Sequence, residues 1–141
     1  MKNPVFIILF VLTTSTTISL AQGPTSISTI DFVKIKDGKR QEALFFYENN
    51  WKVYRDIALE KGYIKSYRLL TTIADTTANF DLILVTEYAD SSQYKIREER
   101  FQQIIKANRP DGPKLLNEFK PNDIRLNVFS KEATTLFAPL K

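Results

Sequence analysis

The feature that most constrains the fold is the order in which the hydrophobic period changes along the chain. A partly alternating run rich in β-branched residues, Ile27–Ile35, ends at the turn signal Asp37-Gly38. A helical period follows over Lys39–Lys61, where no proline interrupts it and Gly62 stands where a helix-ending glycine is expected. Its apolar stripe consists of Ala43, Tyr47, Trp51, Tyr54 and Ala58. The sequence therefore predicts a strand followed by one long helix.

Two further strands are expected after this helix. The runs Ile64–Thr72 and Phe80–Tyr88 are rich in β-branched and aromatic residues, and the polar segment 73–79 separates them. They form an antiparallel hairpin in this interpretation. With the turn centred near Thr76, Lys65 would lie opposite Glu87 and Arg68 opposite Leu84.

A second helix and a last strand complete the pattern. Asp90, with Gln93 three residues later, predicts a helix N-terminus, and the helix should end near Asn108, before Pro110. The linker 111–122 is irregular, and Pro113 is suitably placed to begin a short helix through Phe119. The last strand is expected over Ile124–Phe129, with a continuation toward Phe137 left open.

The N-terminus carries the pattern of a secretory signal peptide. Lys2 precedes the apolar run Val5–Leu12, which is too short to span a bilayer, and Ser19-Leu20-Ala21 provides small residues before a cleavage site. Removing the first 21 of the 141 residues leaves 120, enough for one domain over 22–141 that begins at Gln22. We expect an exported protein, periplasmic or secreted, with no membrane span after the signal is removed.

Strand, helix, strand, strand, helix, strand is the βαββαβ order of the α+β ferredoxin-like fold, in which two helices cover one face of a four-stranded antiparallel sheet. The third strand contains Leu82-Ile83-Leu84-Val85, which is apolar on both of its sides. Leaving several aliphatic side chains in water would forgo about 1.5–3 kcal/mol each. We therefore predict a homodimer that buries the second face of the sheet.

Several of these runs together resemble the dimeric α/β-barrel superfamily. They are Phe32–Lys39, Trp51-Lys52 within the long helix, Gly62–Tyr67 and Leu82–Val85, and the resemblance covers most of the chain after the signal. It implies a dimeric α/β barrel. Members of that superfamily include cofactor-independent monooxygenases, haem enzymes, isomerases and proteins without known activity, so the resemblance implies no particular active site.

Composition excludes many chemistries. The chain has no cysteine and no histidine, which rules out disulfides, thiol nucleophiles, imidazole bases and histidine-ligated zinc or haem. We expect no cofactor. The 20 Lys and Arg residues are mixed with 16 Asp and Glu residues, so we expect no nucleic-acid partner. Scattered carboxylates without calcium-loop spacing lead us to expect no metal; they are Asp75, Asp81, Asp111 and Asp123.

Candidate ligand-binding residues come from the aromatic helix and the second strand. They are Tyr47, Asn50, Trp51, Tyr54, Tyr67 and Arg68. A stripe of Trp and Tyr at this spacing is also typical of an ordinary core. Arg68, a cation between Tyr67 and Leu69, must face solvent, pair with an acid or meet an anionic ligand.

Two functions remain open on the sequence alone. One is an exported dimer without catalytic activity that binds a small, partly apolar ligand or has a structural role. The other is a cofactor-independent, monooxygenase-like enzyme that holds its substrate in a dry aromatic pocket. The enzyme requires Asn50, Trp51, Tyr67 and Arg68 to converge on one cavity, and this distinguishes the two hypotheses.

Overall fold

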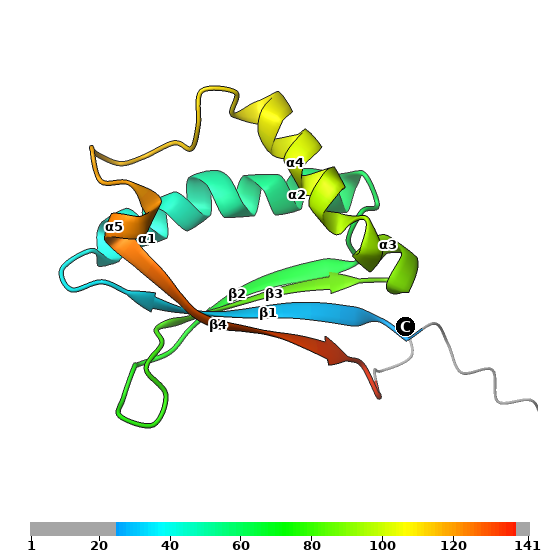
Figure 1. The fold of residues 1–141 in the computed structure, drawn as a ribbon, viewed down its shortest axis with the longest axis horizontal. Helices are drawn as coiled ribbons and strands as arrows, with labels where there is room; N and C mark the ends of the chain where they lie inside the picture. Colours follow the sequence, from blue (N-terminus) through cyan, green and yellow to red (C-terminus); the bar gives the residue numbers. More distant parts are fainter. Residues whose placement is uncertain (1–24, 138–141) are drawn as a thin grey trace, which may run out of the picture.

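The computed structural model describes residues 25–137, which form a four-stranded antiparallel sheet with a layer of helices on one face (Figure 1). The predicted signal peptide lies outside the described residues. The strands are β1 (Ile27–Ile35), β2 (Ser66–Thr71), β3 (Leu82–Tyr88) and β4 (Arg125–Thr134), and their order in the sheet is β2-β3-β1-β4. This topology confirms the predicted ferredoxin-like βαββαβ fold.

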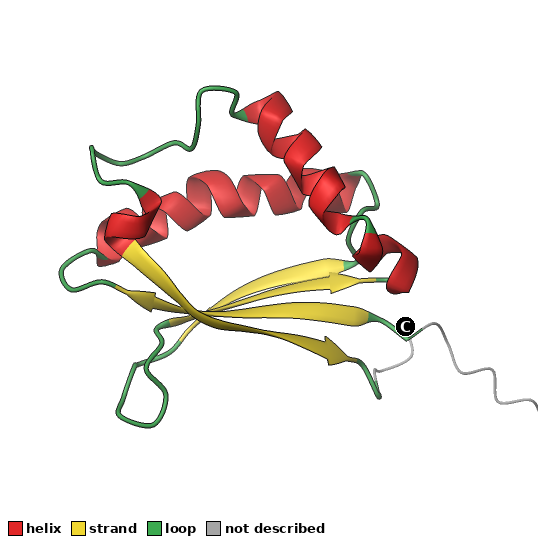
Figure 2. Cartoon of the chain, in the orientation of Figure 1, coloured by secondary structure: helices red, strands yellow, loops and turns green. Residues whose placement is uncertain are grey.

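The strand between residues 27 and 35 has the predicted bounds, whereas the hairpin differs from the prediction. β2 and β3 are shorter than expected, and the connection between them extends below the sheet (Figure 2). Arg68 lies opposite Val85 and Ser66 opposite Glu87, so the predicted register was wrong by one residue. The connection between Thr71 and Leu82 is longer than predicted, and this shifts the centre of the hairpin and with it the register. Lys65 nevertheless forms an ion pair with Glu87, with 2.9 Å between Nζ and Oε1.

The first helical segment runs continuously but contains a π-helical turn. It consists of α1 (Arg40–Phe46), η1 (Tyr47–Trp51) and α2 (Lys52–Glu60). The backbone N–H of Lys52 donates to the carbonyl of Tyr47, five residues back, which marks the wider turn. The predicted helix is therefore present at the expected position, but its central turn is π-helical and not α-helical.

Gly62 ends this helix as predicted. Its φ of +66° is in the left-handed region that glycine adopts without strain. The N–H of Tyr63 donates to the carbonyl of Ala58 at 2.8 Å, and the N–H of Gly62 donates to that of Leu59 at 3.0 Å. These two bonds are those of the Schellman motif, and they satisfy carbonyls that the helix end leaves free.

The second helical segment is split where one helix was expected. Asp90 caps α3 (Ser91–Lys95) by accepting bonds from the N–H groups of Ser92 and Gln93. A change of backbone conformation at Ile96 then begins α4 (Arg97–Asn108), so the prediction of one helix was wrong. The end at Asn108 is as predicted.

The C-terminal part also required correction. The stretch from Pro113 to Phe119 is not helical; instead α5 (Pro121–Ile124) begins with a proline eight residues later. Pro121 at the first helical position needs no backbone N–H, which suits a helix start. β4 follows directly and continues to Thr134, past the predicted end at Phe129.

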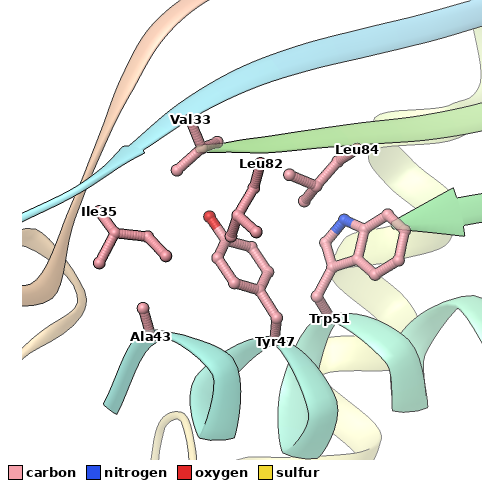
Figure 3. Close-up of a cluster of buried hydrophobic side chains, with 7 residues drawn as sticks. All are labelled: Val33, Ile35, Ala43, Tyr47, Trp51, Leu82 and Leu84. Atoms are coloured by element: carbon pink, nitrogen blue, oxygen red, sulfur yellow. The ribbon is translucent and has the colours of Figure 1, made fainter. Parts of the chain in front are cut away.

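The two faces of the sheet differ in what covers them. Leu82 and Leu84 point toward the helices and are almost completely buried (Figure 3). Ile83 and Val85 point to the opposite face, as strand alternation requires, and in the described residues no helix covers that face (Figure 1). The homodimer through this face stays a prediction. None of the helices described has the length and apolar character to cross a bilayer.

The two ends of the described chain meet at one edge of the molecule. β1 lies beside β4 although the two strands come from opposite ends of the sequence. Beyond the paired strands, the Ser26 hydroxyl donates to the Thr135 hydroxyl at 2.7 Å, and the Thr135 N–H donates to the Ser26 carbonyl at 3.0 Å.

Candidate functional site

A cleft lies between the helices and the half of the sheet formed by β1 and β4. Its first cavity has a volume of about 280 Å³ and is lined by Asp31, Val33, Phe46, Tyr47, Trp51, Tyr54, Arg55, Leu84, Ile105, Arg125 and Asn127. A second opening of about 450 Å³ shares Asp31, Arg55 and Ile105 with the first. Volumes of this order suit a small ligand.

The π-helical turn supplies the aromatic wall of the first cavity. Tyr47 and Trp51 project from it toward the sheet and pack beside Leu82 and Leu84 (Figure 3). Burial raises the pKa of the Tyr47 hydroxyl to about 12, with Arg125 opposing the shift. At neutral pH the hydroxyl is therefore protonated and is suited to hydrogen bonding, not to proton abstraction.

Arg55 is the cation that lines both openings. It belongs to α2, and its guanidinium lies over the rings of Trp51 and Phe101, at 4.8 and 4.1 Å from their centroids. Its Nε donates to the Thr86 hydroxyl at 3.3 Å. Within residues 25–137, no carboxylate lies within ion-pair distance and the terminal nitrogens have no hydrogen-bond acceptor. Burial lowers the pKa of Arg55 to about 10, so the group stays a cation at neutral pH.

A second arginine lines the same cavity from the sheet. Arg125 is the first residue of β4, and its guanidinium lies 4.8 Å from the ring centroid of Phe46 and 5.4 Å from that of Tyr47. Its Nε is buried and has no hydrogen-bond partner among the described residues. The cavity therefore contains a second cation whose donors are incompletely used.

Asp31 is the carboxylate of this cavity. It lies on β1 and accepts a hydrogen bond from the Ser130 hydroxyl of β4 at 2.6 Å. Asp31 lines both openings but is not within ion-pair distance of Arg55 or Arg125. Two guanidinium groups and one carboxylate thus give the lining of the first cavity one formal positive charge in excess.

The structure divides the candidates chosen from the sequence among several places. Tyr47, Trp51 and Tyr54 line the first cavity. Tyr67 packs edge-on against the opposite side of Trp51, with 5.4 Å between ring centroids, and its hydroxyl donates to the Asp56 carboxylate. There it lines a separate, mostly apolar pocket of about 350 Å³ beside β2.

Asn50 and Arg68 lie outside these cavities. The amide of Asn50 is completely buried, where it donates to the carbonyls of Phe46 (3.0 Å) and Lys114 (2.8 Å) and accepts from the N–H of Lys114 (2.7 Å). It therefore fastens the linker after α4 to the first helix. Arg68 is exposed on the uncovered face of the sheet. Asn50, Trp51, Tyr67 and Arg68 do not converge, and the enzyme hypothesis loses that support.

Sequence reasoning missed the three charged residues of the first cavity: Asp31, Arg55 and Arg125. One signal for Arg55 was present, because it lies four residues after Trp51 and so on the same side of the helix. Asp31 and Arg125 line the same cavity only because the first and last strands pair, and local sequence patterns do not reveal this pairing. Among the residues described, no three acidic side chains cluster in a way that could hold a metal ion.

Comparison with known proteins gives only distant structural likeness. No protein-family model and no curated protein matches this chain. It is similar to a structure named as a chlorite dismutase, at 11% identity and a TM-score of 0.43, over 78% of this chain and 43% of that one. It is also similar to a protein from Shewanella loihica named as a monooxygenase, at 16% identity and a TM-score of 0.43, over 82% and 96% of the two chains.

Proposed function

We propose that this protein is an exported homodimer that binds a small, partly apolar molecule without transforming it. The observation that carries this proposal is the cleft beside β1 and β4, where Tyr47, Trp51 and Tyr54 form one wall of a cavity of about 280 Å³. A cavity with aromatic walls and a few polar groups is the usual form of a small-molecule site.

The protonation behaviour of the cleft favours binding over acid–base catalysis. Burial raises the pKa values of Tyr47, Tyr54 and Tyr88, in each case away from neutrality. Arg55 titrates near 10, also above neutral pH. A general acid or base works best when its pKa is near the working pH. The pKa values of these three tyrosines and of Arg55 all lie above neutral pH.

The uncovered sheet face supports the dimer. Phe32 and Phe129 stack there with 4.3 Å between centroids, and Phe80 packs against both rings. Leu70 and Leu126 are about half exposed on the same face, at 45% and 57%. A second copy would bury this apolar surface and leave the cleft accessible, because the cleft lies on the helical side. The N-terminal signal pattern supports export.

Native mass spectrometry of the chain from Gln22, purified without delipidation, tests the proposal. We expect a dimer with a retained ligand. Ile105→Trp should reduce that occupancy, since Ile105 lines both openings of the cleft. Leu116→Trp, in the exposed linker, is the matched control and should retain the ligand. Equal occupancy in both variants would place the ligand elsewhere, and a monomer would refute the dimer.

A further inference from the structure

The guanidinium of Arg55 is held in a way that prepares it for an anion. It lies over the rings of Trp51 and Phe101, and its Nε donates to the Thr86 hydroxyl. These contacts fix the plane of the group, and its terminal nitrogens have no hydrogen-bond acceptor among the described residues, on a side chain that lines both openings. A planar guanidinium with two free, parallel donors fits the two oxygens of a carboxylate.

The charges of the cleft indicate where an anion is needed and how many charges it carries. The second opening is balanced, with Arg55, Arg97 and Lys131 facing Asp31, Glu98 and Glu132. The first cavity is not balanced, because Arg55 and Arg125 are accompanied by Asp31 alone. One negative charge would neutralise the lining, so a monoanion suits this cavity better than a neutral molecule or a dianion.

The remaining lining describes the rest of the ligand. Phe46, Tyr47, Trp51 and Tyr54 are aromatic, and Val33, Leu84 and Ile105 are aliphatic. The volume of about 280 Å³ is at the low end for ligand pockets, which favours a compact molecule. Flat rings pack well against aromatic walls.

We propose that the first cavity binds a small aromatic monocarboxylate, whose carboxylate accepts hydrogen bonds from the terminal nitrogens of Arg55 and whose ring packs against the aromatic wall. This inference rests on the proposed function and specifies its ligand class. Arg125 adds a second cation to the same cavity and attracts the anion from the sheet side.

Titration calorimetry with benzoate and with its neutral analogue benzamide tests the proposal on the mature chain. We expect benzoate to bind about tenfold to a hundredfold more tightly, the range for a hydrogen-bonded charge pair. Arg55→Met should abolish this preference. Arg55→Lys, which keeps the charge but loses the fork, should retain only part of it. Arg40→Met is the matched control, because Arg40 is exposed on α1, and it should behave as the wild type.

Two results would overturn the inference. One is equal affinity of the wild type for benzoate and benzamide, including no binding of either at millimolar concentration. The other is a benzoate preference that persists in Arg55→Met with an unchanged circular dichroism spectrum. If native mass spectrometry still finds an uncharged ligand that Ile105→Trp displaces, the carboxylate inference fails and the proposed function stands.

Discussion

Asn50, which is completely buried, and Arg55, which is half-buried, are polar residues of the same helical segment, and their surroundings differ sharply. Asn50 makes three hydrogen bonds at 3.0 Å or less, to Phe46 and to both backbone groups of Lys114. The side chain of Arg55 makes one, at 3.3 Å, to Thr86. Burying polar groups is costly unless they are hydrogen-bonded. Asn50 is thus a structural residue, whereas Arg55 lines a cavity and retains unused donors.

The number of satisfied hydrogen bonds separates a polar residue that holds the structure together from one that has donors left for a ligand. Of the two, only Asn50 was among the candidates chosen from the sequence, as a residue between Tyr47 and Trp51 on the aromatic helix. In the structure, Tyr47 and Trp51 of the aromatic stripe pack in the core. Arg55, four residues after Trp51, is the residue with unused donors. Substitutions at these positions should therefore separate effects on stability from effects on binding.

Trp51 should show the largest effect on stability, since it packs between the cleft and the pocket beside β2. Trp51→Ala is expected to lower the free energy of unfolding by about 3–5 kcal/mol, the range for removing a buried large aromatic side chain. Trp51→Phe should cost much less. Urea denaturation followed by circular dichroism measures both. A small loss for the alanine variant would show that Trp51 is a ligand-contacting side chain with little role in packing.

Asn50→Ala should come next and tests the comparison directly. It removes three buried hydrogen bonds and leaves the backbone groups of Lys114 without these partners, so a loss of about 2–4 kcal/mol in the free energy of unfolding is expected. Arg55→Met is the contrasting variant, and its change should stay within about 1 kcal/mol because a desolvated charge is removed along with its ring contacts. The same urea experiment applies. If Arg55→Met were the more destabilising of the two, the distinction drawn here would be wrong.

Glu87 should show a smaller effect than Trp51 or Asn50, and it provides a pH test of a polar group outside the cleft. Burial raises its pKa, but hydrogen bonds from Lys65 and Ser66 outweigh this and hold it at about 2, below the usual 4.5. The lower folded-state pKa means that this stabilisation is complete above pH 4.5 and disappears as the pH falls toward 2. Because the pair is partly exposed, we expect only about 1–2 kcal/mol.

Urea denaturation at pH 7 and pH 3 measures this contribution. The wild type should lose more stability between these two pH values than Glu87→Gln, which cannot titrate at this position. An equal loss in both proteins would show that Glu87 contributes nothing specific.

Much of the fold could be predicted because its signals are local. The alternation of β1, the glycine at the end of α2 and the Asp90 cap each depend on neighbouring residues only. The π-helical turn was missed, although the sequence contains a trace of it. The apolar stripe advances by four residues twice in succession, from Ala43 to Tyr47 to Trp51, which is a longer repeat than the ~3.6 residues per turn of a regular α-helix.

The site was less predictable because it depends on distant pairing. Arg125 meets Ile35, and Ser130 meets Asp31, only when β4 pairs with β1. The predicted register of the β2–β3 hairpin was wrong for a related reason. The polar loop between the two strands contains no sequence signal that fixes the length of the turn. Arg68 was chosen for its place between two apolar residues, yet strand alternation directs it to the sheet face without helices.

The meeting of Ser26 with Thr135 has a consequence for how the molecule is made. Even the nearest residues of the β1–β4 pairing, Ile35 and Arg125, are 90 positions apart, so β1 acquires its second neighbour only once the chain through β4 is present. Pairings of such long range form slowly. Until β4 is present, β1 has an open edge whose unpaired backbone groups are available to another strand.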